Sequence, residues 1–242
     1  MGTNGVYATK TGNTSCILLD TEGRYVILDA GDGIHKAKGC LEETKPTHIF
    51  LSHFHLDHII GLHLLDEFKF EGPLRIYGKR GARRALNLIL NEPFSRPLAE
   101  LPYEVVIEEL DEGWHEYPFR FCCMLLPHKD PSLGYRLELD DRVIAYCTDT
   151  GPHGNILELA KDADVLISEC ALRPGRASEE WPHMNPEIAA KVAKMANAKL
   201  LILTHFNAAE YGTIEEREEA GGRAKEIFEN TVVAADGMEL EL

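Results

Sequence analysis

The chain has 242 residues, 44% of them hydrophobic, and a formal net charge of −15 from 25 basic and 40 acidic residues. Such acidity would repel a phosphate backbone, so a broad nucleic-acid-binding surface is disfavoured. No apolar run approaches the roughly 18 residues of a membrane-spanning helix, and the N-terminus lacks the pattern of a secretory signal. We therefore expect a soluble, cytoplasmic protein without a membrane partner, with one α/β domain over residues 1–242.

Short apolar runs bounded by turn residues recur along the chain and predict strands at 16–20, 25–30, 48–52, 74–77, 104–109, 119–126, 134–139, 142–147, 164–170, 199–204 and 230–234. Amphipathic patterns predict helices at 57–68, 81–90, 155–160, 186–196 and 214–228. Asn185 and Pro186 suit the cap and the first position of the fourth helix, so His183 should lie just before its N-terminus. Grouped strands with helices between them indicate sheets with helices packed outside.

Several polar residues are expected on the surface. The one basic cluster, in "GKRGARRAL", contains Lys79, Arg80, Arg83 and Arg84 and is interpreted as the solvated face of a helix. His48 and His63 are expected on strand or helix surfaces.

The stretch "LSHFHLDHI" places three histidines and an aspartate directly after an apolar run. His53 and His55 are two residues apart, so their imidazoles point the same way on an extended segment and can hold one metal ion. Asp57 and His58 begin the next helix and can turn toward a second ion. Zinc suits these donors, and manganese or iron is also accepted by His and Asp. One histidine alone would more often be a turn or core residue, but so dense a cluster predicts a metal site.

Six positions cannot complete two coordination shells, so further ligands must come from elsewhere. The candidates are polar residues at the ends of apolar strands: His128 in "MLLPHKD", Asp149 in "IAYCTDTG" and His205 in "LILTHF". With the first cluster they amount to five histidines and two aspartates. This set suffices for two divalent ions if Asp149 bridges them.

With these residues in place, the chain resembles the metallo-β-lactamase superfamily, whose signature is H-x-H-x-D-H followed by separated His, Asp and His. The resemblance runs from "NTSCILLD" and "ILDAGDG" to "TVVAADG". It implies a four-layer αβ/βα sandwich with a two-metal site at one edge. It also implies that His53, His55 and His128 bind one ion, that Asp57, His58 and His205 bind the other, that Asp149 bridges, and that Asp29 supports the ligands.

Fold and metal ions do not decide the substrate. "GYRLE", "YCTDTG", "VLISECAL" and "HMNPEIAAKVAKMANAKLLILTHF" resemble the ribonuclease Z branch, in which a histidine upstream of the last metal ligand assists phosphodiester cleavage. His183, 22 residues before His205, matches that histidine. Ribonuclease Z usually carries a long arm that grips transfer RNA between the third histidine motif and the bridging aspartate. Here only 21 residues separate His128 from Asp149, a spacing more like the small cyclic-phosphate phosphodiesterases related to ribonuclease Z.

The resulting hypothesis is hydrolysis of a small or cyclic phosphodiester by water activated between two divalent ions. Asp57 would orient the nucleophile, and His183 would stabilise the added charge or protonate the leaving oxygen. Other residues have weaker candidate roles. These are phosphate binding by Arg173 and Arg176, with loop solubility as the alternative, contact with a histidine by Glu169, and lining of the site by His153.

Three other functions stay open. The first is transfer-RNA 3′ processing without the usual arm, although the acidic charge makes transfer RNA a less favoured partner than a small molecule. The second is thioester or lactone hydrolysis of the glyoxalase II kind, and the third is a metal-stabilised binding module. The oligomeric state is also open, a homodimer included.

Overall fold

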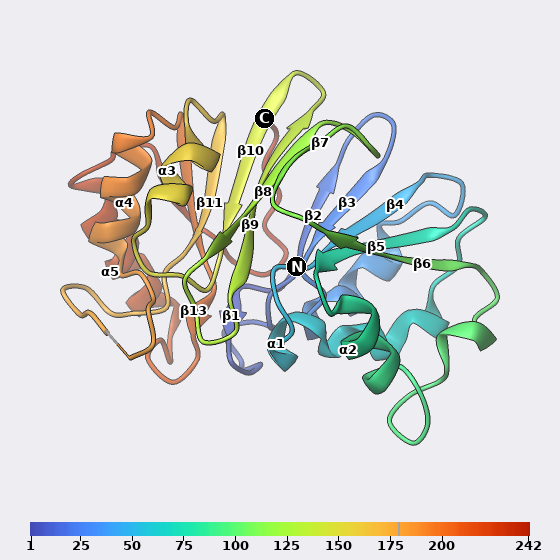
Figure 1. The fold of residues 1–242 in the computed structure, drawn as a ribbon. Helices are drawn as coiled ribbons and strands as arrows, with labels where there is room; N and C mark the ends of the chain where they lie inside the picture. The colour runs from blue at the N-terminus through green and yellow to red at the C-terminus, as the bar shows by residue number, and fades with distance from the viewer. Residues whose placement is uncertain (179) are drawn as a thin grey trace.

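Two β-sheets pack face to face in the computed structural model, which describes residues 1–178 and 180–242 (Figure 1). Side chains from both inner faces form a central core. Within it, the ring of Phe50 meets the rings of Phe121 and Tyr135 edge-on, with centroids 5.1 and 5.3 Å apart. Helices cover the outer face of each sheet, so the order of layers is helix, sheet, sheet, helix. The predicted αβ/βα sandwich is confirmed.

The five-stranded sheet has the order β2 (Ile17–Asp20), β3 (Tyr25–Leu28), β4 (Thr47–Phe50), β5 (Leu74–Lys79) and β6 (Val105–Leu110). β2 and β3 are antiparallel, and the other neighbours are parallel. Every residue of β3 and β4 is buried because both faces of these strands are covered. The helical segments of this half are η1 (Asp32–Gly39), α1 (Leu56–Ile59), η2 (Ile60–Glu67), α2 (Ala82–Ile89) and η3 (Leu98–Glu100).

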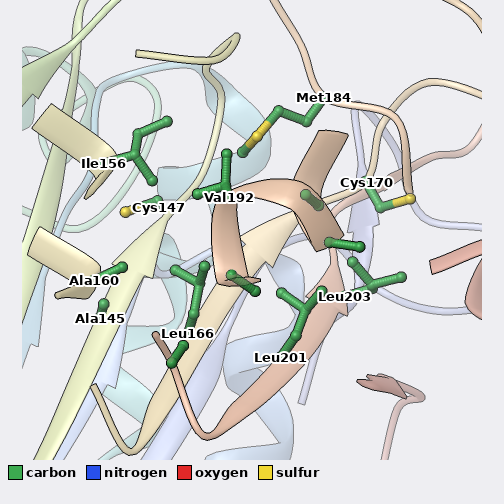
Figure 2. Packing of buried hydrophobic residues seen from close by; sticks show 14 of the residues in the cluster. Ala145, Cys147, Ile156, Ala160, Leu166, Cys170, Met184, Val192, Leu201 and Leu203 are labelled. Atoms are coloured by element: carbon green, nitrogen blue, oxygen red, sulfur yellow. The ribbon is translucent and has the colours of Figure 1, made fainter. Parts of the chain in front are cut away.

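The seven-stranded sheet has the order β14 (Thr231–Val233), β12 (Leu200–Thr204), β11 (Val165–Glu169), β10 (Arg142–Cys147), β9 (Ser132–Leu139), β8 (Phe121–Leu126) and β7 (Gly113–His115). Its outer face is covered by α3 (Gly154–Ala160), α4 (Pro186–Met195) and α5 (Ile214–Lys225). Figure 2 shows Leu166 and Leu201 of the sheet in one cluster with Ile156 of α3 and Val192 of α4. Burying each large apolar side chain contributes about 1.5–3 kcal/mol.

All the predicted strands are present, but the helix predicted at 57–68 is divided into α1 and the 3₁₀ helix η2. The α-helical hydrogen bonding stops because the Gly61 N–H donates to the carbonyl of Ala30, at 2.9 Å, instead of to its own helix. A Cβ atom at Gly61 would lie 2.1 Å from the carbonyl oxygen of Gly31, so the close approach requires glycine.

A two-stranded sheet that the sequence did not predict joins β1 (Asn4–Gly5) to β13 (Phe206–Asn207). The fully buried Arg217 holds the N-terminal segment in place, donating to Thr3 Oγ1 (3.0 Å), Thr11 Oγ1 (2.8 Å) and the side-chain oxygen of Asn4. β13 directly follows His205, so this sheet brings the start of the chain beside a candidate metal ligand. Among the described residues, no helix is both long and apolar enough to cross a membrane.

The prediction that His48 lies on a strand surface is wrong. Only 6% of His48 is exposed, because β4 is covered on both faces and the imidazole packs near the rings of Tyr77 and Phe119. Its Nδ1 is buried without a hydrogen-bond partner among the described residues. Burial lowers the pKa of His48 to about 4, and Arg24 and Arg75 act in the same direction.

We therefore expect His48 to make the fold acid-sensitive. An unfolded histidine has a pKa of about 6.5, so between pH 6.5 and pH 4 the unfolded chain binds more protons and stability falls as the pH falls. When the pH falls from 7 to 5, the free energy of unfolding of the wild type should decrease by about 1–2 kcal/mol more than that of His48→Phe. Urea unfolding followed by circular dichroism measures the difference. Replacing the exposed His63 by Gln is the control, and equal losses in wild type and His48→Phe would contradict the prediction.

Candidate metal centre

The seven candidate ligands come from segments that follow strands at one edge of the sandwich. His53 and His55 follow β4, and Asp57 and His58 lie in the short helix α1. The other three follow β8, β10 and β12, which run in the same direction: His128, Asp149 and His205. Because the carboxyl ends of such strands meet at a common edge, residues far apart in the sequence come together here.

The ligand atoms form two groups. One consists of His53, His55, His128 and Asp149, the other of Asp57, His58 and His205, and within each group the atoms lie within 4.8 Å of one another. His53 Nε2 is 2.9 Å from His55 Nδ1, and His58 Nε2 is 3.1 Å from His205 Nε2. Nδ1 of His128 and of His205 is buried without a partner among the described residues. Converging imidazole nitrogens and carboxylate oxygens are the donors that zinc prefers, so these residues fit a divalent cation.

Asp149 lies between the two groups. Its Oδ2 is 3.0 Å from His58 Nε2 and 3.2 Å from His205 Nε2, whereas its Oδ1 is 3.6 Å from His128 Nε2. The hydroxyl of Thr148 donates to Oδ2 at 2.9 Å. One carboxylate therefore faces both groups, as a bridging ligand would.

Three residues of the site adopt left-handed backbone conformations at the ends of strands. The φ angles are 56° at Asp29, 48° at Asp149 and 50° at His205. This conformation costs an ordinary residue about 1–2 kcal/mol. Such strain is concentrated at functional sites, where the surrounding structure imposes it.

Buried carboxylates dominate the electrostatics of the cluster. Burial opposes protonation of His58, but Asp149, Asp29 and Asp57 outweigh it and raise the pKa of His58 well above its usual value. Burial likewise opposes ionisation of Asp149, yet His205 and His58 hold the pKa of this carboxyl well below its usual range. The buried carboxylates of Asp29, Asp57 and Asp149 are therefore stabilised by nearby positive charge, which protons or a metal ion can supply.

Asp29 supports the cluster from behind. The fully buried carboxylate accepts hydrogen bonds from His58 Nδ1 (2.7 Å), the Ser52 N–H (2.7 Å), the Ser52 hydroxyl (2.8 Å) and the Tyr146 hydroxyl (2.6 Å). These contacts orient the His58 ring so that Nε2 faces the other ligands. Sequence reasoning missed Ser52 and Tyr146. Adjacency to His53 was the only signal for Ser52, and Tyr146 had none.

His183 contacts the cluster without belonging to either group. Its ring centroid lies 5.1 Å from that of His128 and 6.3 Å from that of His205. Both carboxylate oxygens of the buried Glu169 are within 3.0 Å of His183 Nδ1. Burial opposes the charged imidazolium, but Glu169 outweighs it and raises the pKa of His183 to about 9. Glu169 therefore favours the protonated form of the imidazole.

The N-terminal segment closes one side of the cluster, which no sequence pattern indicated. The Val6 N–H donates to Asp57 Oδ2 at 2.8 Å, and a Cβ at Gly5 would lie 2.6 Å from the His205 ring. Val6 has φ = 74°, unusual for a β-branched residue. A strained backbone thus directs an amide toward a candidate ligand.

Three weaker candidates lie in other contacts. The His153 side chain caps α3, accepting from the Asn155 N–H at 3.3 Å. Arg173 pairs with Glu216 at 3.3 Å, and Arg176 pairs with Glu210 at 3.4 Å. Over the described part of the chain, none of the three has a hydrogen bond or ion pair with a residue of the two ligand groups.

The chain is similar in sequence to several known proteins. The family model for the β-lactamase superfamily domain matches residues 24–206. Ribonuclease Z of Methanosarcina acetivorans is 28% identical over 305 aligned positions, covering 100% of this chain and 96% of the relative. Ribonuclease Z of Bacillus licheniformis is also 28% identical, covering 100% and 97%. The alignment with the Methanosarcina relative has 63 more positions than the 242 residues of this chain. About 63 residues of that relative therefore have no counterpart here.

Solved structures have the same fold. The short form of human tRNase Z has a TM-score of 0.77 at 26% identity, covering 98% of this chain and 95% of that one. The metallo-β-lactamase fold protein YhfI of Bacillus subtilis has a TM-score of 0.78 at 22% identity, with the same coverages. A diphosphatase of the PhnP family has a TM-score of 0.72 at 19% identity, covering 95% and 84%. The expected membership is confirmed: this chain belongs to the β-lactamase superfamily domain family and is a hydrolase of the metallo-β-lactamase superfamily.

Proposed function

We propose that the protein is a metal-dependent hydrolase of small or cyclic phosphodiesters. The observation that carries the proposal is His183, whose imidazole is held by Glu169 against the ligand cluster but outside both ligand groups. Phosphodiester cleavage adds negative charge to the phosphoryl group and releases an alkoxide that needs a proton. A thioester hydrolase has less need of this residue, because a thiolate leaves without protonation.

In this proposal, His53, His55 and His128 would hold one divalent ion, Asp57, His58 and His205 would hold a second, and Asp149 would face both. Bound ions, zinc by preference of the donors and manganese or iron as alternatives, would supply Lewis-acid activation of water and of the phosphoryl group.

Side chains of the protein orient the attacking water and protonate the leaving oxygen. Because the Val6 N–H fixes Asp57 Oδ2, the Asp57 carboxylate is oriented to accept a hydrogen bond from the attacking water. The Nδ1 of His183 is bonded to Glu169, so its Nε2 is the atom that donates a proton to the leaving oxygen. Glu169 favours retention of that proton because its carboxylate raises the pKa of His183.

Size and charge favour a small substrate. The interval between His128 and Asp149 is filled by the β9–β10 hairpin, which leaves no residues for an inserted arm. The net charge of −15 acts against a long polyanion. A second candidate, transfer-RNA 3′ processing, is favoured by the relatives named ribonuclease Z and tRNase Z.

A substrate panel separates these functions. We expect metal-loaded protein to hydrolyse bis(p-nitrophenyl) phosphate and 2′,3′-cyclic nucleotides with a higher kcat/KM than a precursor transfer RNA. S-lactoylglutathione should be a poor substrate. Faster, site-specific cleavage of the transfer RNA would replace the proposal with the second candidate, and turnover of the thioester alone would reject both.

The role of His183 is tested by the leaving group. We expect His183→Ala to lower kcat about 10²–10⁴-fold for the dinucleotide ApA, whose ribose oxygen must be protonated. The loss should be much smaller for thymidine 5′-(p-nitrophenyl phosphate), because p-nitrophenolate leaves without a proton. His153→Ala, which changes the histidine that caps α3, is the matched control. Equal losses for both substrates would exclude proton donation by His183.

The bridging role of Asp149 is tested by metal content. In Asp149→Asn we expect bound metal, measured by inductively coupled plasma mass spectrometry, to fall from about two ions per chain to one or fewer, because a neutral amide cannot bridge two cations. Asparagine tolerates the left-handed backbone, so the fold should persist. Asp141→Asn is the control, since Asp141 also has a positive φ, 62°, but lies exposed in the β9–β10 hairpin. An unchanged metal content in Asp149→Asn would reject the assignment.

A further inference from the structure

A cavity of about 610 Å³ lies beside the two loops that carry candidate ligands of the metal centre. Phe54, which lies between His53 and His55 in the chain, lines this cavity, and its N–H donates to Asp130 Oδ2 at 3.3 Å. Asp130 also lines the cavity and follows His128 by two residues. The two loops that carry three candidate ligands of the first group therefore form one side of the cavity.

The walls of the cavity are mainly apolar. Phe54, Leu88, Leu110, Leu125 and Leu133 contribute to them. Leu88 and Leu125 are 67% and 38% exposed, although a solvent-facing helix or strand position would normally be polar. A concave apolar surface with a few polar groups is typical of a small-molecule site.

Cations surround this apolar surface. Lys79, Arg80 and Arg84 line the cavity and belong to the one basic cluster of the acidic chain. The cluster was expected to be a solvated helix face, but Lys79 ends β5 and Arg80 precedes α2. Arg83 and Arg84 lie exposed in α2, as expected, and Arg84 precedes Leu88 by one turn, so both Arg84 and Leu88 can face the same ligand.

Hydrogen-bond donors of these cations remain available. Lys79 pairs with Asp130 and also donates to the Pro131 carbonyl, at 2.7 Å. Arg80 uses Nε for Asp111, at 2.7 Å, and its side chain is 80% exposed. Arg84 has no ion pair or hydrogen bond of its side chain among the described residues.

The acidic residues of the lining are already engaged. Asp130 accepts from Lys79 and from the Phe54 N–H, and Asp111 accepts from Arg80. Glu112 Oε1 accepts from the Leu125 N–H at 2.7 Å. The Arg84 guanidinium, unpaired among the described residues, therefore favours an anion, and its planar fork matches a phosphate or carboxylate.

We propose that this cavity binds the end of the substrate that lies away from the cleaved bond, an aromatic or apolar group that carries a second anionic group. This assignment rests on the proposed function. A 5′-phosphorylated dinucleotide has the required chemistry, with its phosphodiester at the metal centre and its base and terminal phosphate in the cavity. An independent anionic effector would use the same contacts, but the position of the cavity beside the ligand-bearing loops favours a group attached to the substrate.

The first experiment measures binding without catalysis. Isothermal titration calorimetry follows 5′-AMP, which combines a base and a phosphate, binding to metal-loaded protein. We expect Arg84→Glu and Leu88→Ser each to weaken binding at least fivefold. Arg83→Glu is the matched control, with the same charge change one residue earlier but outside the cavity lining. Equal affinities in wild type, Arg84→Glu and Leu88→Ser would overturn the cavity as a site, whether or not the protein hydrolyses phosphodiesters.

The second experiment tests whether the ligand is part of the substrate. We compare kcat/KM for the phosphorylated dinucleotide pApA with that for bis(p-nitrophenyl) phosphate, which has no second anionic group. We expect the ratio to fall at least tenfold in Arg84→Glu through a higher KM for pApA, and to change less than twofold in Arg83→Glu. An unchanged ratio together with Arg84-dependent AMP binding would identify an independent effector and overturn the substrate assignment. Absence of any hydrolysis would reject the proposed function instead.

Discussion

The buried carboxylate of Asp29 is the contact on which the arrangement of the site depends. It lies at the end of β3 in one sheet and accepts a hydrogen bond from Tyr146 of β10 in the other, 117 residues away. It also accepts from Ser52 and from His58. A buried carboxylate is costly unless donors satisfy it, so the two sheets and the first histidine cluster must meet at this point. Burial and then Asp29 raise the pKa of Tyr146 well above its usual value, so its hydroxyl remains a donor.

The strained residues around the site depend on regular structure elsewhere. Asp149 and His205 leave parallel strands in left-handed conformations, and Val6 does so beside β1. Each conformation is unfavourable alone, and the ladders of β10, β11 and β12 supply the rigidity that maintains it. Hydrogen bonds from Arg217 likewise hold the N-terminal segment, and with it Val6, in position. The stability of the packed layers thus sustains a geometry that the local backbone would avoid.

The chain lacks residues that one relative has, and it has a cavity beside the candidate metal centre. It is 28% identical to ribonuclease Z of Methanosarcina acetivorans, and about 63 aligned positions of that relative have no counterpart here. Three of its cations, Lys79, Arg80 and Arg84, line one cavity beside the loops that carry candidate ligands. A compact ligand with two anionic groups matches this distribution better than a long polyanion, which needs many separate phosphate contacts.

The sequence by itself determined what depends on local pattern. Alternating apolar residues predicted the longer strands, and H-x-H-x-D-H with three strand-end residues singled out the seven side chains that the structure brings together. Only the tertiary structure decided which distant segments meet. It paired two-residue strands β1 and β13, too short to show a period, and buried His48 between covered faces. In the folded chain, Arg173 and Arg176 form ion pairs with glutamates, and Arg84 lies beside an apolar cavity. A side chain's neighbours across the fold depend on packing between layers, and one chain's local spacing does not encode them.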